Sequence, residues 1–242
     1  MFGDIVNAQG ERLDYAYHAG AENSSDLVVL GHGVTGNKDR PFIVVLAETL
    51  AAAGLPALRF SFSGNGDSGG RFVDSTISKE VDDLGAVLDA AADRRICYVG
   101  HSMGGAVGVL RASRDNRIRL LVSLAGMVHT AAFNEREFGD VTPDAGDMWD
   151  EPDCPLSRTY VEDMNAISSV LDRASAVAVP WLLIHGSADD VVPIGDSRDI
   201  VAAQATANLV ELSGADHVFS KDGTDPMVSE AASWISSQFE AL

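Results

Sequence analysis

The sequence predicts an α/β fold built on one open, mostly parallel sheet with helices on both faces. Short apolar runs alternate along the chain with longer segments of helical periodicity. The short runs show little polar alternation, as expected for strands that are buried on both faces. The length of 242 residues fits one large domain of this class or two small ones, and no linker or internal repeat divides the chain. We therefore expect a single domain over residues 1–242.

The individual elements follow from these runs and periods. The expected strands lie at residues 27–30, 56–62, 96–99, 120–124, 181–184 and 209–212. The expected helices lie at residues 42–53, 79–92, 103–114, 160–174, 197–205 and 226–239. Gly54 is placed to end the first of these helices. At the start of the chain, the turn at Gln9 and Gly10 predicts an antiparallel hairpin at the edge of the sheet.

One long connection, residues 127–159, has no clean period. Gly, Pro and Asp alternate there with isolated large apolar side chains, namely Phe133, Phe138, Met148 and Trp149. A connection of this length inside a compact domain usually serves function. We expect a small lid insertion whose apolar side chains contact the substrate, with a disordered surface insertion as the alternative.

Charge and hydropathy exclude several classes of partner. The chain has 36 acidic and 17 basic residues, a formal net charge of −19, which repels phosphate backbones and argues against nucleic acid. Such a surface fits either life in high salt or a GC-rich genome, and we favour the second. No run approaches the ~18 apolar residues of a membrane span. Because the first residues also lack a signal-peptide pattern, we expect a cytoplasmic protein with no membrane partner.

No cofactor or metal is expected. Cys97 and Cys154 show no CxxC spacing, so a disulfide framework is not indicated. No cluster of His, Cys and carboxylates has metal-ligand spacing. The glycine-rich residues 63–70 match neither a dinucleotide fingerprint nor a P-loop, and they are best interpreted as a structural turn.

The most informative segment is the pattern G-x-S-x-G around Ser102, which lies between an expected strand and an expected helix. This context predicts a strained turn that holds the serine oxygen clear of the backbone. Side chains at Gly100 and Gly104 would clash in such a turn. The helix N-terminus after the serine favours developing negative charge. We therefore predict that Ser102 is a catalytic nucleophile.

A serine nucleophile needs a base, and the base needs an orienting carboxylate. Of the six histidines, His217 follows the last expected strand, so its loop lies over the sheet edge where Ser102 emerges. His101 is expected to point elsewhere on the turn, and the other four are interpreted as structural or surface residues. The acid is expected after the strand at 181–184, where position alone leaves Asp189 and Asp190 open.

The second requirement is an oxyanion hole, a pair of backbone N–H groups of which each contributes about 2.7–4 kcal/mol to lowering the barrier. One donor is expected from Met103, the residue after the nucleophile. The other is expected from Val34, in a His-Gly turn that follows the strand at 27–30.

Five segments in order, HGVTGNKDRPF, RFSFSGNGDSGG, GHSMGG, HGSADDVVP and GADHVF, resemble the α/β-hydrolase superfamily over nearly the whole chain. Within it the chain is most similar to the cinnamoyl and feruloyl esterase-like serine hydrolases. The resemblance implies that Asp189, the first acidic position of H-G-x-x-D-x-x-V-P, is the triad acid. It also implies oxyanion donors at Val34 and Met103 and a small inserted domain at residues 127–159. The chain departs from many members at Val34, where they carry Phe.

These inferences predict a serine carboxylesterase that hydrolyses small-molecule esters, with hydroxycinnamate esters as the class the resemblance implies. The same triad would also serve a thioesterase or a hydrolase of small amides or peptides. A third interpretation is a hydrolase fold kept as a non-catalytic ligand-binding protein. The sequence says nothing of the oligomeric state.

Overall fold

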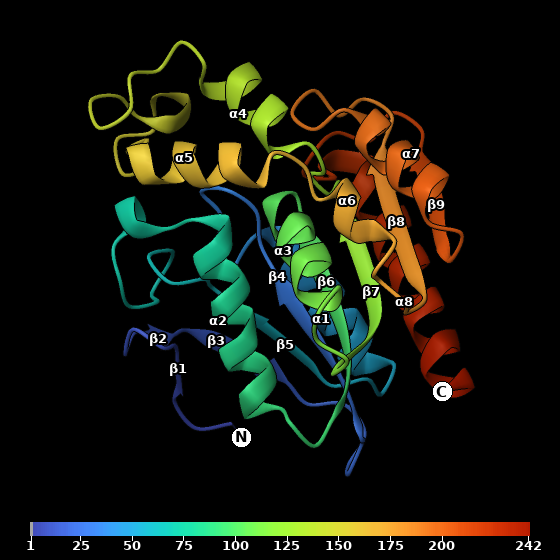
Figure 1. The fold of residues 1–242 in the computed structure, drawn as a ribbon. Helices are drawn as coiled ribbons and strands as arrows, with labels where there is room; N and C mark the ends of the chain where they lie inside the picture. The colour runs from blue at the N-terminus through green and yellow to red at the C-terminus, as the bar shows by residue number, and fades with distance from the viewer. Residues whose placement is uncertain (1) are drawn as a thin grey trace.

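The computed structural model describes residues 2–242, which form a seven-stranded sheet between two layers of helices (Figure 1). The strand order is β3-β5-β4-β6-β7-β8-β9. In chain order the strands are β3 (Tyr15–His18), β4 (Asp26–Gly31), β5 (Ala57–Phe60), β6 (Arg95–His101), β7 (Ile118–Leu124), β8 (Trp181–Gly186) and β9 (Ala207–Leu212). Only β3 runs antiparallel to its neighbour within this described sheet. The predicted fold class is confirmed.

The expected hairpin at the N-terminus forms, but its predicted place at the edge of the large sheet is wrong. Its strands, β1 (Ile5–Val6) and β2 (Arg12–Leu13), make a separate two-stranded sheet. Ile5 and Leu13 are buried in the same core cluster as the apolar face of the helix over residues 77–90, so burial holds the hairpin against that helix. β3 is the edge strand instead.

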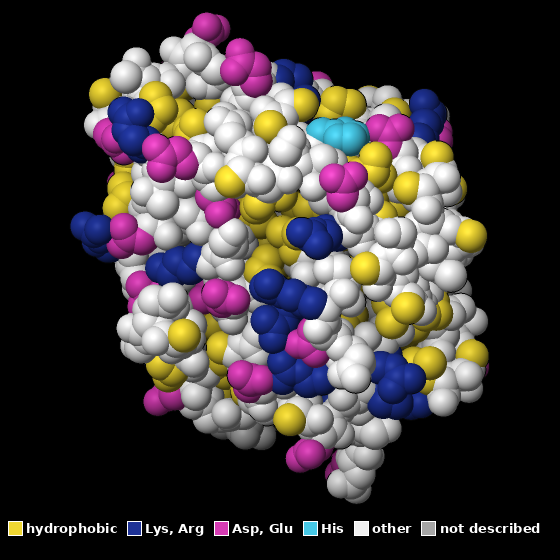
Figure 2. All heavy atoms as spheres, viewed as in Figure 1, with side chains coloured by type: hydrophobic (Ala, Val, Ile, Leu, Met, Phe, Trp, Pro, Cys, Tyr) yellow, Lys and Arg dark blue, Asp and Glu magenta, His cyan; other side chains and the backbone are white. Residues whose placement is uncertain are grey.

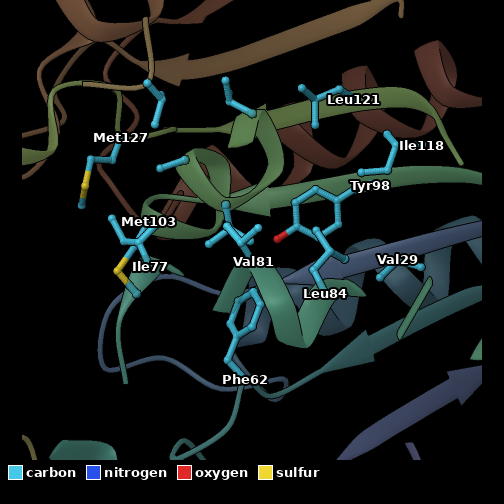
Figure 3. Close-up of a cluster of buried hydrophobic side chains, with 14 of the residues drawn as sticks. Val29, Phe62, Ile77, Val81, Leu84, Tyr98, Met103, Ile118, Leu121 and Met127 are labelled. Atoms are coloured by element: carbon cyan, nitrogen blue, oxygen red, sulfur yellow. The ribbon is translucent and has the colours of Figure 1, made fainter. Parts of the chain in front are cut away.

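Two apolar cores lie on the two faces of the sheet. α1 (Pro41–Ala52) and α8 (Thr224–Ala241) cover one face, and α2 (Ile77–Ala90), α3 (Met103–Ala112) and α7 (Ile194–Ala203) cover the other. Successive β4 side chains point to opposite faces: Val28 and Leu30 enter the first core, Leu27 and Val29 the second. Figure 3 shows the second core, where Tyr98 packs beside Val81 and Leu84 and where Met103 lies near Ile77.

Local signals account for where several helices begin and end. Pro41 starts α1, and the Thr76 and Ser157 hydroxyls cap α2 and α5 (Arg158–Ile167) by accepting backbone N–H bonds. The helix expected at 160–174 is divided into α5 and α6 (Leu171–Ala174). Ser168, with a φ of 60°, ends α5 and turns the chain between the two helices.

The segment 127–159 is ordered into α4 (Thr130–Phe138), the 3-10 turn η2 (Met148–Asp150) and the approach to α5. A β-bridge between Asp147 and Pro155 closes its loop. Figure 1 shows this segment and α5 lying above the ends of the central strands and α3. Two further 3-10 turns are η1 (Phe72–Asp74) and η3 (Lys221–Gly223). No helix within residues 2–242 has the length and apolar character needed to cross a membrane.

Candidate active site

Ser102 lies at the sharp turn between β6 and α3. Its φ of 52° and ψ of −119° place it in a strained region, as expected for a serine raised above a strand-to-helix turn. A Cβ at Gly100 would lie 2.1 Å from the Gly104 carbonyl oxygen, and a Cβ at Gly104 would lie 2.5 Å from that of His32. The predicted need for glycine at both positions is confirmed. The turn is possible only because both positions lack a side chain.

The backbone of Ser102 is bonded on both sides to the end of β7. Its N–H donates to the Leu124 carbonyl at 3.0 Å, and its carbonyl accepts from the Met127 N–H at 3.0 Å. The next two N–H groups, of Val128 and His129, donate to a carboxylate oxygen of Asp196 at 2.8 and 3.2 Å. The start of the 127–159 segment is thereby fixed to both the Ser102 turn and α7.

His217 pairs with Asp189 and not with Asp190, which is exposed. His217 Nδ1 donates to Asp189 Oδ2 at 2.8 Å, and the Asp189 side chain is completely buried. Asp189 Oδ1 accepts the backbone N–H groups of Val191 and Val192, both at 2.9 Å. Burial raises the pKa of Asp189, but hydrogen bonds from His185, His217 and the Val192 N–H outweigh it, and the pKa lies below its ordinary value.

Two further histidines touch this pair, and the sequence interpretation gave neither a place there. His185 Nε2 lies 3.2 Å from Asp189 Oδ2 and 2.9 Å from the Val192 carbonyl oxygen, and its Nδ1 accepts from the Ser197 hydroxyl at 2.7 Å. The expectation that His101 points away from the site is wrong. Its ring centroid lies 4.8 Å from that of His217. The contact of His185 with Asp189 is local, four residues along the chain, whereas that of His101 joins residues 116 positions apart and no sequence spacing reveals it.

The loop after β4 passes close to Ser102. Gly33 approaches so closely that a Cβ there would lie 2.7 Å from Ser102 Cβ. Within residues 2–242, neither the Val34 N–H nor the Met103 N–H donates to a protein acceptor. His32 holds the loop: its Nδ1 donates to the Gly33 carbonyl and its Nε2 accepts from Phe62 N–H. Burial lowers the pKa of His32 to about 4, so its ring is neutral at pH 7.

A pocket of about 270 Å³ opens at Ser102, His217 and Val34. Of the four insertion residues expected to contact substrate, only Trp149 lines it. Met148 lines a narrower cavity beside it. Phe133 and Phe138 are buried behind Trp149, with ring centroids 6.4 and 4.9 Å from its ring. Neither lines either pocket. Their packing instead positions Trp149.

The narrow cavity contains a residue that the sequence interpretation missed. Glu80 of α2 is only 1% exposed and lines this cavity together with Val34 and Met103. A signal was present, because Glu80 stands three residues after Ile77 and four before Leu84, in the apolar stripe of the helix. A charged side chain in such a stripe is uncommon and indicates a special role.

A separate groove on the face over α2 and α3 takes no part in this site. Figure 2 shows it as a hollow with a hydrophobic floor and with Lys or Arg side chains below it. It has a volume of about 420 Å³, and its lining includes Val81, Leu110, Ile167, Arg114 and Arg173. None of its lining residues also lines the pocket at Ser102.

Comparison with known proteins agrees with the fold. Residues 26–151 match the family model described as the alpha/beta hydrolase fold. The solved structure of Est1E from Butyrivibrio proteoclasticus with bound ferulic acid has a TM-score of 0.87 and 25% identity, covering 97% of this chain and 98% of that one. A monoacylglycerol lipase of Mycolicibacterium smegmatis is 25% identical over 265 residues, covering 93% of each chain.

An uncharacterised protein of Mycobacterium tuberculosis is 30% identical over 187 residues, which are 75% of this chain but 59% of that relative. The chain thus spans less than two thirds of this relative's length. The family match covers more than half of the chain, and it includes the strand, turn and helix around Ser102. The chain therefore belongs to the α/β hydrolase fold family.

Proposed function

We propose that the protein is a serine carboxylesterase that cleaves small carboxylic esters through an acyl-enzyme on Ser102. One observation carries the proposal: Ser102, His217 and Val34 line one pocket, Met103 lines the cavity beside it, and Asp189 is bonded to His217. A nucleophile, an oriented base and an oxyanion hole are the complete set that acyl transfer needs.

The roles follow from the hydrogen bonds. Because His217 Nδ1 carries the proton that it donates to Asp189, its Nε2 is the free lone pair that takes the proton of Ser102. Ser102 Oγ attacks the ester carbonyl carbon, and the tetrahedral oxyanion accepts the Val34 and Met103 N–H groups. His217 then returns the proton to the leaving alcohol. Water repeats the sequence on the acyl-enzyme and releases the carboxylic acid.

Among the described residues 2–242, no hydrogen bond joins Ser102 Oγ to the His217 ring. Such contacts are often long before substrate binds and tighten in the Michaelis complex. The backbone of Ser102 is fixed in its strained turn, and the loop of His217 is held by a bond to His101. We therefore propose that a small side-chain movement brings Ser102 Oγ and the His217 ring together when substrate binds.

Pocket size favours small substrates. The pocket of about 270 Å³ lies just below the ~300–1,000 Å³ typical of small-molecule sites. Its apolar lining includes Trp149, Val191 and Val218, and its lining also holds the cation Arg40. Hydroxycinnamate esters are the aromatic class we propose first, because Est1E is a structural neighbour with bound ferulic acid.

The first test measures kcat/KM on p-nitrophenyl esters from acetate to decanoate, with methyl ferulate, methyl p-coumarate and an acyl-CoA alongside. We expect turnover of short esters that is abolished in Ser102→Ala. Rapid labelling of Ser102 by a fluorophosphonate distinguishes an enzyme from a binding protein. Ester turnover by Ser102→Ala near the wild-type rate would refute the proposed mechanism, and faster turnover of acyl-CoA would favour a thioesterase.

A further inference from the structure

Glu80 lies unpaired in the narrow cavity beside the oxyanion hole. Within residues 2–242, its Oε2 is buried and has no hydrogen-bond partner. The cavity has a volume of about 10 Å³, which is room for one water-sized group. Its lining includes both predicted oxyanion residues, Val34 and Met103, and also Tyr160, whose hydroxyl contacts Met103 Sδ at 3.6 Å.

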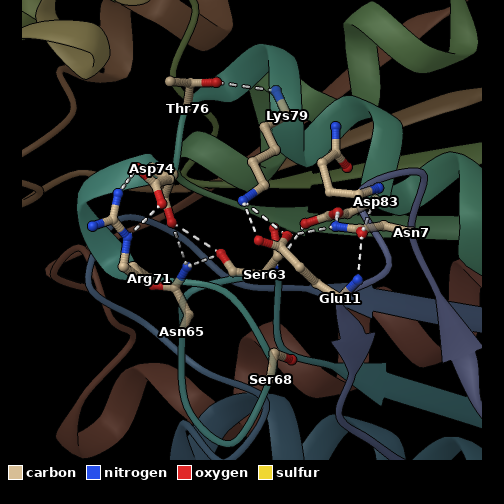
Figure 4. A network of polar contacts seen from close by, with 12 residues as sticks. Asn7, Glu11, Ser63, Asn65, Ser68, Arg71, Asp74, Thr76, Lys79 and Asp83 are labelled. Atoms are coloured by element: carbon tan, nitrogen blue, oxygen red, sulfur yellow. Dashed lines mark hydrogen bonds and ion pairs between the residues drawn. The ribbon is translucent and has the colours of Figure 1, made fainter.

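A neighbouring buried acid shows that the fold can satisfy a carboxyl here. Asp83, less than one helical turn from Glu80, accepts the Asn7 side-chain amide on Oδ1 and the Ser63 N–H on Oδ2, both at 2.8 Å (Figure 4). Lys79 is paired with Glu11 at 2.9 Å in the same network. The fold therefore supplies partners to Asp83 and leaves Glu80 facing the cavity.

The surroundings of Glu80 favour its acid form. Burial raises its pKa well above the ordinary value, and the carboxylates of Asp83 and Asp163 raise it further, against a smaller opposing effect of Lys79. The other titratable groups near it are the hydroxyls of Tyr98 and Tyr160, whose pKa values burial raises, so both stay neutral. A neutral carboxyl offers one O–H donor and free acceptor positions.

The cavity is reached from the nucleophile. Val34 and Thr35 line both the cavity and the 270 Å³ pocket that contains Ser102. An acyl group whose carbonyl oxygen accepts the Val34 and Met103 N–H groups would lie next to the cavity, because both residues line it. A short acyl chain that enters the cavity would meet Glu80, which also lines it.

We infer that this cavity is an acyl subsite and that Glu80 is a specificity residue which hydrogen-bonds a hydroxyl group on the acyl chain of the substrate. The inference rests on the proposed function and names a class of acyl group for it. A hydroxyl fits both the room for one small group and the combined donor and acceptor of a neutral acid. A carboxylate on the acyl chain is disfavoured by the negative charges of Asp83 and Asp163.

The test uses pairs of methyl esters in which a terminal hydroxyl replaces a terminal methyl group. One such pair is methyl 6-hydroxyhexanoate and methyl heptanoate, and the pairs cover a series of short acyl chains. Isothermal titration calorimetry gives the Kd ratio of each pair in the Ser102→Ala background, where no ester is consumed. The same ratios are measured with Glu80→Met or Glu80→Gln added. Asp82→Asn, which changes an exposed acid on the same helix, is the matched control.

We expect one chain length to favour the hydroxyl ester, and Glu80→Met to reduce that preference about tenfold. Glu80→Gln, which still donates and accepts, should retain most of it, and Asp82→Asn should leave the ratio unchanged. Equal ratios with Glu80 present and in the Glu80→Met variant would overturn the inference and leave Glu80 as the site of a structural water. Tighter binding of an ester with a terminal ammonium group would overturn it in favour of an ionised Glu80.

Failure of the proposed function has a different signature. If wild-type protein cleaves none of these esters, the esterase proposal fails, while the binding ratios still decide the role of Glu80. If wild-type protein cleaves them but no pair shows a hydroxyl preference that depends on Glu80, the subsite proposal fails alone. Thermal melting of each variant confirms that it is folded before its ratio is compared.

Discussion

The Nε2 atom of His101 lies 2.9 Å from the main-chain carbonyl oxygen of His217. The residue before the proposed nucleophile, Ser102, thus holds the loop that carries the proposed base. Burial lowers the pKa of His101 well below its ordinary value, so the ring is neutral and donates Nε2–H to the carbonyl. The contact fixes the distance between Ser102 and His217 without taking part in proton transfer.

Replacing His101 by Ala should lower kcat/KM about tenfold to a hundredfold, because small misplacements of reacting groups are costly. The loss should appear mainly in kcat on short p-nitrophenyl esters. The control is His129→Ala, which removes a histidine of the 127–159 segment that pairs with Asp199 of α7. If His101→Ala keeps the wild-type kcat, the carbonyl contact does not position the base.

Asp189→Asn should lower kcat by about 10⁴, since the base loses the acceptor that fixes its tautomer. The pKa of Asp189 is depressed in the folded state, so its contribution to stability is present above the unfolded pKa and is lost as pH falls through the folded pKa. Wild-type protein should therefore lose more of its Tm than the variant does as the solution is acidified below the ordinary pKa of an aspartate. Parallel Tm curves would contradict this assignment.

Glu80 should have the opposite pH signature. Because its pKa is raised in the folded state, folding becomes less favourable as pH rises above the unfolded value and the unfolded chain ionises. Glu80→Gln should therefore raise Tm more in mildly alkaline than in acidic buffer. Because residues that are kept for function often reduce stability, a gain in Tm on replacing the buried Glu80 is consistent with a functional role. An equal change of Tm in both buffers would mean that the acid is not held neutral.

Gly33→Ala should slow both ester turnover and fluorophosphonate labelling, because the new methyl group would lie 2.7 Å from Ser102 Cβ and displace the Val34 loop. We expect a loss in kcat/KM of about a hundredfold, the effect of removing one oxyanion donor. The control is Gly195→Ala in α7, where a Cβ meets nothing within 4 Å. Labelling of Gly33→Ala at the wild-type rate would show that the loop adjusts.

The sheet, the Ser102 turn and the loops that carry Asp189 and His217 could be predicted because their signals are local. Two glycines fix the turn, and the carboxyl ends of parallel strands bring the loops to one edge. The contact of His101 with His217 could not be predicted, since it joins residues 116 positions apart. α4 was missed because its helical period is weak, and packing of Phe133 and Phe138 against Trp149 stabilises it.

The fixed start of the 127–159 segment also has a consequence for how this protein could be diversified. Met127 is bonded to Ser102, and Val128 and His129 are bonded to Asp196, so these residues belong mechanically to the scaffold. The part from α4 to the Ser157 cap of α5 is bounded by these anchors and by a helix start. Replacing the segment between those limits with that of a relative would exchange the part of the chain above the pocket. The Ser102 turn and its bonds would be left unchanged.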